Sequence, residues 1–136
     1  MIRKFLLITA LFFATSAGAA EYKSSEEILK DLAVYTSADS KKDEEHLASI
    51  VVKIDEAVQF SLKNKPSEQL LHEILRVSYI TLKNDPTAAV ADVLVPLYKK
   101  DEKAFKKALK TLPKSEGNAL LKAIKQAIHE EDVGNG

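Results

Sequence analysis

Apolar residues recur three and four positions apart along most of the chain, and short polar stretches interrupt them. This spacing places the apolar side chains on one face of an α-helix and predicts amphipathic helices. A polar, charged stretch at 36–45 predicts an exposed connector. We therefore expect an all-α fold of about six helices, either a compact orthogonal bundle or a short solenoid of helical hairpins. The expected helices lie after Ser24, over 43–63, 66–83 and 86–97, after Asp101 and after Pro113.

A short punctuation pattern separates several of these helices. The sequence Leu-Lys-Asn-x-Pro occupies 62–66 and, twenty residues later, 82–86, and a looser copy occupies 109–113. Proline suits the first turn of a helix because it lacks an N–H and fixes φ, and it disfavours helix in the residue before it. Each copy therefore predicts that one helix ends, the chain turns tightly, and the next helix begins.

Polar side chains mark the expected starts of individual helices. Ser24 followed by Glu27 matches a capping box, in which the serine accepts a backbone N–H and the glutamate reaches back. Asp85 before Pro86 predicts an N-cap and a first-turn proline for the helix over 86–97. Asp101 predicts an N-cap for the helix that follows.

The helix over 86–97 is expected at the centre of the domain. Between Thr87 and Leu97 its only charged residue is Asp92, and a helix that is apolar on nearly all sides is usually buried. Pro96 predicts a kink or a break, because an interior proline removes a helical hydrogen bond. The core is expected in this helix and the one before it, at Leu70, Leu71, Ile74, Leu75, Val90, Val93 and Leu94.

The amino-terminal segment has the three parts of a bacterial secretory signal peptide. Basic Arg3 and Lys4 precede an apolar run over 5–14, and small residues follow up to Ala20. The apolar run is shorter than the roughly 20 residues that a membrane-spanning helix needs, so we expect cleavage and no stable membrane anchoring. We predict a periplasmic or secreted protein with a signal peptide at 1–20, a single helical domain at 21–133 and a disordered tail at 134–136.

The charge balance and the residue types limit the classes of function. The chain carries 20 basic and 20 acidic residues, and loss of the signal peptide removes two of the basic ones. A protein dedicated to nucleic acid usually has a basic excess, so we expect no nucleic-acid partner. The chain has no cysteine, and therefore neither a disulfide nor a thiol nucleophile. It also lacks a glycine-rich loop for a phosphate.

No residue pattern predicts catalysis, a cofactor or a metal site. His72-Glu73 begins like the zinc-peptidase motif H-E-x-x-H, but Arg76 stands where the second histidine belongs. The other two histidines lie in acidic stretches that are typical of solvated helix ends. Asp92 is the one acid on an apolar helix, where burial would raise its pKa, and Arg76 is a candidate partner for it. We nevertheless predict a non-enzymatic protein.

The clearest asymmetry along the chain is in charge. Nine lysines but only three acids lie between 99 and 125, whereas 21–45 holds eight acids and four lysines. Such a run of lysines is typical of a solvated helix face, and it also suits docking to an acidic surface. Four of them share the outer face of the helix after Asp101, opposite Phe105 and Leu109, and are named the lysine face: Lys103, Lys106, Lys107 and Lys110.

Two classes of function agree with these observations. The first is an exported, non-catalytic protein that binds another envelope or secreted protein with an acidic surface through the lysine face, as an inhibitor, immunity protein or adaptor does. The second is a periplasmic carrier for a small ligand or a lipid, with an apolar cavity between the helices over 66–83 and 86–97.

Overall fold

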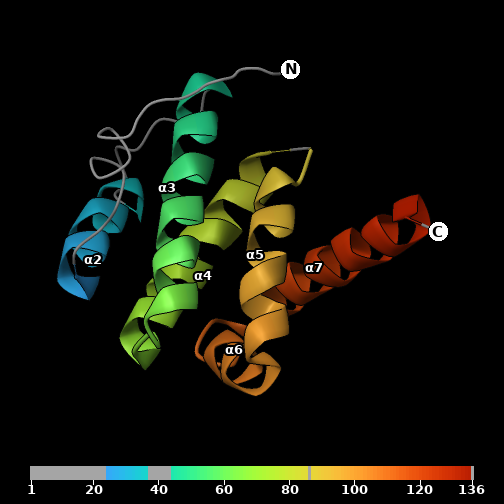
Figure 1. Cartoon of the computed structure of the whole chain (residues 1–136). Helices are drawn as coiled ribbons and strands as arrows, with labels where there is room; N and C mark the ends of the chain where they lie inside the picture. The colour runs from blue at the N-terminus through green and yellow to red at the C-terminus, as the bar shows by residue number, and fades with distance from the viewer. Residues whose placement is uncertain (1–23, 37–43, 86, 136) are drawn as a thin grey trace, which may run out of the picture.

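The computed structural model describes residues 24–36, 44–85 and 87–135, which form six α-helices and one short 3₁₀ helix (Figure 1). No β-strand occurs in these ranges, and the predicted all-α fold is confirmed. The predicted signal peptide at 1–20 lies outside the described residues. The elements are α2 (Ser25–Ala33), the 3₁₀ helix (Val34–Thr36), α3 (Glu44–Lys63), α4 (Glu68–Asn84), α5 (Ala89–Lys100), α6 (Glu102–Leu109) and α7 (Lys114–Asn135).

Two of the helix starts follow the caps that the sequence predicts. The Ser24 hydroxyl accepts the Glu27 N–H at 3.3 Å at the start of α2. The Asp101 carboxylate accepts the Ala104 N–H at 3.1 Å at the start of α6. Each side chain satisfies a backbone donor that has no partner within the helix, which fixes where the helix begins.

The two close copies of the punctuation pattern make the same hydrogen bonds. The hydroxyls of Ser61 and Thr81 are buried, and each donates at 2.9 Å to the backbone carbonyl four residues earlier. The side-chain amides of Asn64 and Asn84 likewise donate to the carbonyls four residues earlier, at 3.2 and 2.8 Å. The Phe60 carbonyl also accepts the Asn64 backbone N–H at 2.8 Å, so the asparagine side chain adds a second bond to a carbonyl in the last turn of the helix. The pattern therefore ends α3 and α4 in one way, as predicted.

The copies differ in how the next helix begins, and the predicted start at 86 is wrong. Asp85 does not cap α5; its carboxylate accepts the backbone N–H of Thr87 at 2.9 Å and the Thr87 hydroxyl at 2.7 Å. This local turn competes with helix formation, so α5 starts at Ala89. The residue before it, Ala88, has φ 56° and ψ 32°, in the left-handed region that costs a non-glycine residue energy. In the first copy Ser67 caps α4 instead, through the Leu70 N–H at 3.1 Å.

Helix α4 lies at the centre of the domain, not α5 as the sequence predicts. It contacts α2, α3, α5, α6 and α7. Helix α5 packs on α3, α4, α6 and α7 but leaves Asp92, Pro96 and Lys99 exposed. Asp92, Pro96 and Lys99 are four and three positions apart, so they share one side of α5, and this side faces solvent.

The sequence predicts a kink or a break at Pro96, and of these two the break does not occur, since α5 continues through Pro96 to Lys100. The proline is exposed, while Leu94, Val95 and Leu97 around it are buried. Contacts on the buried side hold the helix across the missing hydrogen bond. Of the core residues predicted from sequence, all are buried except Val93, which is half-buried.

The helices also contact one another in two alternating series. In one series α4 contacts both α2 and α6, and in the other α5 contacts both α3 and α7. Figure 1 shows α3 and α5 side by side. Alternation of this kind is a property of helical-hairpin solenoids. Contacts of α4 with α3, α5 and α7, among others, join the two series, so a single core runs through the domain.

The carboxy-terminal helix is longer than the sequence predicts. Helix α7 runs to Asn135, so residues 134–135 of the expected tail are helical, and Gly136 lies outside the described residues. The last turns extend beyond the other helices (Figure 1), and residues 129–133 are exposed. An ion pair of 3.1 Å between Lys99 and Glu131 links this end of α7 to α5. None of the helices in the described ranges has the length and hydropathy of a bilayer span.

Candidate functional site

The lysine face lies where the sequence predicts it, on the outer side of α6. Phe105, Ala108 and Leu109 are buried on the inner side of this helix. Successive helical residues are about 100° apart, so the four lysines span about 100° of the circumference. Lys106 is half-buried and the other three are exposed. The structure therefore presents Lys103, Lys106, Lys107 and Lys110 together on one surface.

Two of these lysines already have acidic partners. Lys106 pairs with Glu102 at 2.9 Å within α6, and Lys107 pairs with Glu68 of α4 at 2.8 Å. The hydrogen bond from Lys107, and then its charge, lower the pKa of the Glu68 carboxyl. Among the described residues no hydrogen bond or ion pair engages the side chains of Lys103 and Lys110. The lysine face is thus partly neutralised, by Glu68 of α4 at Lys107 and by Glu102 of α6 at Lys106.

On its other side, the lysine face borders a groove between α6 and the start of α7. The groove has a volume of about 540 Å³, a floor of leucines and a rim of lysines, and no acid lines it among the described residues. Lys106 and Lys110 belong to the lysine face, and Lys114 comes from α7. We name this feature the basic groove, which is lined by Lys106, Leu109, Lys110, Leu112, Lys114, Gly117, Asn118 and Leu121.

A close approach of two helices forms the bottom of the basic groove. Gly117 in the first turns of α7 is buried, and a Cβ atom built on it would lie 2.8 Å from the Leu109 carbonyl oxygen. Real Cβ atoms do not approach a backbone oxygen so closely, so only glycine allows this contact between α6 and α7. The sequence does not predict Lys114, Gly117 and Leu121 as groove residues, because they lie on a different helix from the lysine face. The one signal was the position of Lys114 inside the lysine-rich stretch 99–125.

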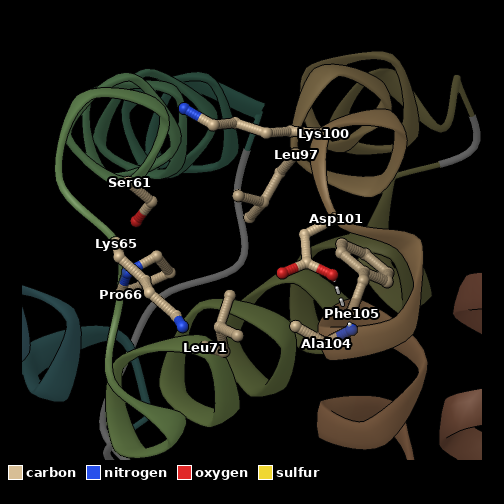
Figure 2. A pocket seen from close by; sticks show the side chains of 9 residues that line it. All are labelled: Ser61, Lys65, Pro66, Leu71, Leu97, Lys100, Asp101, Ala104 and Phe105. Atoms are coloured by element: carbon tan, nitrogen blue, oxygen red, sulfur yellow. Dashed lines mark hydrogen bonds between the residues drawn. The ribbon is translucent and has the colours of Figure 1, made fainter.

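A second cavity lies where two turns of the chain meet, with a volume of about 280 Å³ (Figure 2). The sequence predicts a cavity between the helices over 66–83 and 86–97. The observed cavity lies at one end of those helices and is completed by the end of α3 and by α6. We name it the turn pocket, which is lined by Ser61, Lys65, Pro66, Leu71, Leu97, Lys100, Asp101, Ala104 and Phe105.

The structure does not bring the other candidate residues, Asp92, Arg76 and His72, together. Asp92 is exposed on α5. Arg76 pairs with Glu73 at 3.3 Å instead of with Asp92. His72 Nδ1 lies 2.6 Å from the Thr111 hydroxyl. Because that hydroxyl donates to a backbone carbonyl, the histidine is the donor, in a bond that ties α4 to the end of α6. In the described part of the chain no three acidic or histidine side chains are grouped to hold a metal.

No protein-family model, curated protein or solved structure matches the chain.

Proposed function

We propose that the chain is an exported, non-catalytic protein that binds another envelope or secreted protein with an acidic surface, as an inhibitor, immunity protein or adaptor. The observation that supports this proposal is the basic groove. Three lysines surround a leucine floor, and no acid is among the described lining residues. Lys106 is paired with Glu102 beside the groove, whereas no ion pair engages Lys110 or Lys114 in the described part of the chain. Such a surface complements an acidic segment that carries an apolar side chain, because the leucines receive the side chain and the lysines pair with the acids around it.

The chemistry of the surrounding surface favours a protein partner over a lipid membrane. Stable membrane association usually needs two signals, such as a basic cluster together with an inserted apolar group. The exposed large hydrophobic residues of the described chain are Val34, Val52 and Val133, and all three lie outside α6 and the start of α7. Within the described ranges, the lysines of the basic groove therefore have no exposed large apolar neighbour that could enter a bilayer.

Two matched triple variants test the proposal. The groove variant carries Lys106→Glu, Lys110→Glu and Lys114→Glu. The control variant carries three reversals at exposed lysines outside the groove, namely Lys30→Glu, Lys83→Glu and Lys122→Glu. Because both variants change net charge equally, a difference between them reports on position and not on overall charge.

The experiment immobilises the mature protein and exposes it to an envelope extract of the organism that encodes it. We expect wild type and the control variant to retain the same protein, and the groove variant to lose it. High salt of about 1 M, where the Debye length is about 3 Å, should release it. Equal capture by the groove and control variants would contradict the proposal. So would binding of wild type, but not of the groove variant, to vesicles of anionic phospholipid, since the groove would then serve a membrane.

A second candidate function, a periplasmic carrier of a small ligand, is favoured by one observation. The turn pocket has a volume of about 280 Å³ and an apolar floor. Ligand sites are commonly of about 300–1,000 Å³, so this pocket suits a small molecule and is too small for a lipid with two acyl chains.

A further inference from the structure

The turn pocket has a rigid apolar floor. Leu71 of α4, Leu97 of α5 and Phe105 of α6 are buried and line it. The Phe105 ring meets the Tyr98 ring edge to face, with 5.3 Å between the centroids and 90° between the planes. Side chains held in this way from three helices form a fixed surface for one branched aliphatic group.

The rim of the turn pocket carries the acid Asp101 and the base Lys65 on opposite sides, and Lys100 is a second base on it. Lys65 comes from the turn between α3 and α4, and Asp101 from the junction of α5 and α6. Figure 2 shows the Asp101 carboxylate and the Lys65 ammonium on either side of the space, with Leu71 and Leu97 between them in this view. No ion pair joins the two charges among the described residues. Each is therefore available to a ligand.

Hydrogen bonds within the protein hold some of the polar groups of the turn pocket and leave others for a ligand. One oxygen of the Asp101 carboxylate accepts the Ala104 N–H at 3.1 Å, which orients the group and leaves its second oxygen for the pocket. Lys100 also lines the pocket, but its ammonium donates to the Leu62 carbonyl. The Ser61 hydroxyl donates to the Ala57 carbonyl at 2.9 Å, so it is left as an acceptor. The Lys100 ammonium keeps its charge but is held at the end of α3, which leaves the Asp101 carboxylate and the Lys65 ammonium as the charges on the two sides of the pocket.

We propose that the turn pocket binds a small zwitterion, an α-amino acid with an aliphatic side chain. Its ammonium pairs with Asp101, its carboxylate pairs with Lys65, and its side chain lies on Leu71, Leu97 and Phe105. A monoanion or a monocation would leave one of the two rim charges covered and unpaired, which costs binding energy. The inference names the ligand class for the carrier function, and it is independent of the protein-binding proposal because the turn pocket and the basic groove share no residue.

The test compares three isosteric probes against the ¹⁵N-labelled mature protein by NMR. L-leucine carries both charges, isocaproate lacks the ammonium, and isoamylamine lacks the carboxylate. We expect millimolar L-leucine to shift the amide signals of Leu71, Asp101 and Ala104. The other two probes should bind with an affinity lower by about tenfold or more. Equal affinity for L-leucine and isocaproate would overturn the zwitterion assignment while leaving a carrier of anions. If none of the probes shifts these signals, both the assignment and a carrier function in this pocket are wrong.

Two substitutions separate the charges from the fold. Asp101→Asn removes the negative charge, but asparagine caps helices as well as aspartate does, so α6 should keep its start. Lys65→Gln removes the positive charge from an exposed position. Each should weaken L-leucine binding about tenfold with an unchanged melting temperature, and Asp101→Asn should leave the weak isocaproate binding unaffected or improved. A Lys83→Gln protein, changed away from the pocket, is the control and should bind like wild type. Unchanged L-leucine binding in either charge variant would overturn the proposal.

Discussion

Replacement of Ile74 by alanine measures how far the domain depends on α4. Ile74 is 0% exposed and lies in the core, on the helix that contacts every other α-helix described. The substitution removes three carbon atoms, which at about 0.8 kcal/mol each amount to about 2.4 kcal/mol of transfer free energy. The cavity left behind adds a further contribution, so we expect a loss of about 3–4 kcal/mol in the free energy of unfolding.

The same helix offers a matched control. Ile80 is only half-buried and lies outside the core cluster, so Ile80→Ala should cost about 1 kcal/mol or less. Urea unfolding followed by far-ultraviolet circular dichroism gives both values, and an unchanged m-value would show that the unfolded state is the same. The melting temperature of Ile74→Ala should fall by roughly 10–20 °C. If Ile74→Ala costs no more than Ile80→Ala, α4 does not occupy the centre of the core.

Three further predictions concern single positions. Gly117→Ala should destabilise the protein by about 1–2 kcal/mol in urea unfolding, although alanine favours helices, because its Cβ would lie 2.8 Å from the Leu109 carbonyl oxygen; a more stable variant would contradict that contact. Ala88→Gly should stabilise it by about 0.5–1 kcal/mol, because φ is 56° there; a loss of stability would contradict that backbone geometry. The pKa of Glu68 is lowered by Lys107, so this pair stabilises the fold fully at pH values above the ordinary carboxyl pKa of 4.5. The stabilisation is lost as the pH falls through the lower pKa that Glu68 has in the folded protein. NMR titration of the Glu68 carboxyl should give a midpoint below 4.5 that rises in Lys107→Met, and an unmoved midpoint would show that the ion pair is absent in solution.

Elements with a continuous apolar stripe were predictable from sequence almost to the residue. The helix expected over 43–63 is α3, Glu44–Lys63, because its stripe persists over several turns and no competing turn interrupts it. The start of α5 was not predictable in this way. Asp85 before Pro86 fits an N-cap and an Asx turn equally well by type, and only the bonds to Thr87 decide between them.

The candidate sites were predictable only where they lie on one helix. Spacing within α6 places the lysine face correctly, because helical geometry fixes which residues share a side. The basic groove also needs Lys114 and Leu121 from α7, and the turn pocket brings Lys65 and Asp101 together from separate turns. Sequence spacing carries no information on such contacts between helices, which follow from packing. The close approach of Gly117 to the Leu109 carbonyl is another contact between helices that sequence spacing does not predict.

The central claim, that the basic groove binds an acidic protein partner, is tested most directly by association kinetics. The captured partner is immobilised, and the association rates of wild type, the groove variant and the control variant are measured by surface plasmon resonance over a range of salt concentrations. Charges at the rim of an interface act mainly on the association rate and its salt dependence. The account predicts that the groove variant associates at least about tenfold more slowly at low salt, with a flatter salt dependence, while its melting temperature and the rate of the control variant stay close to wild type. An unchanged low-salt association rate in the groove variant would contradict the account.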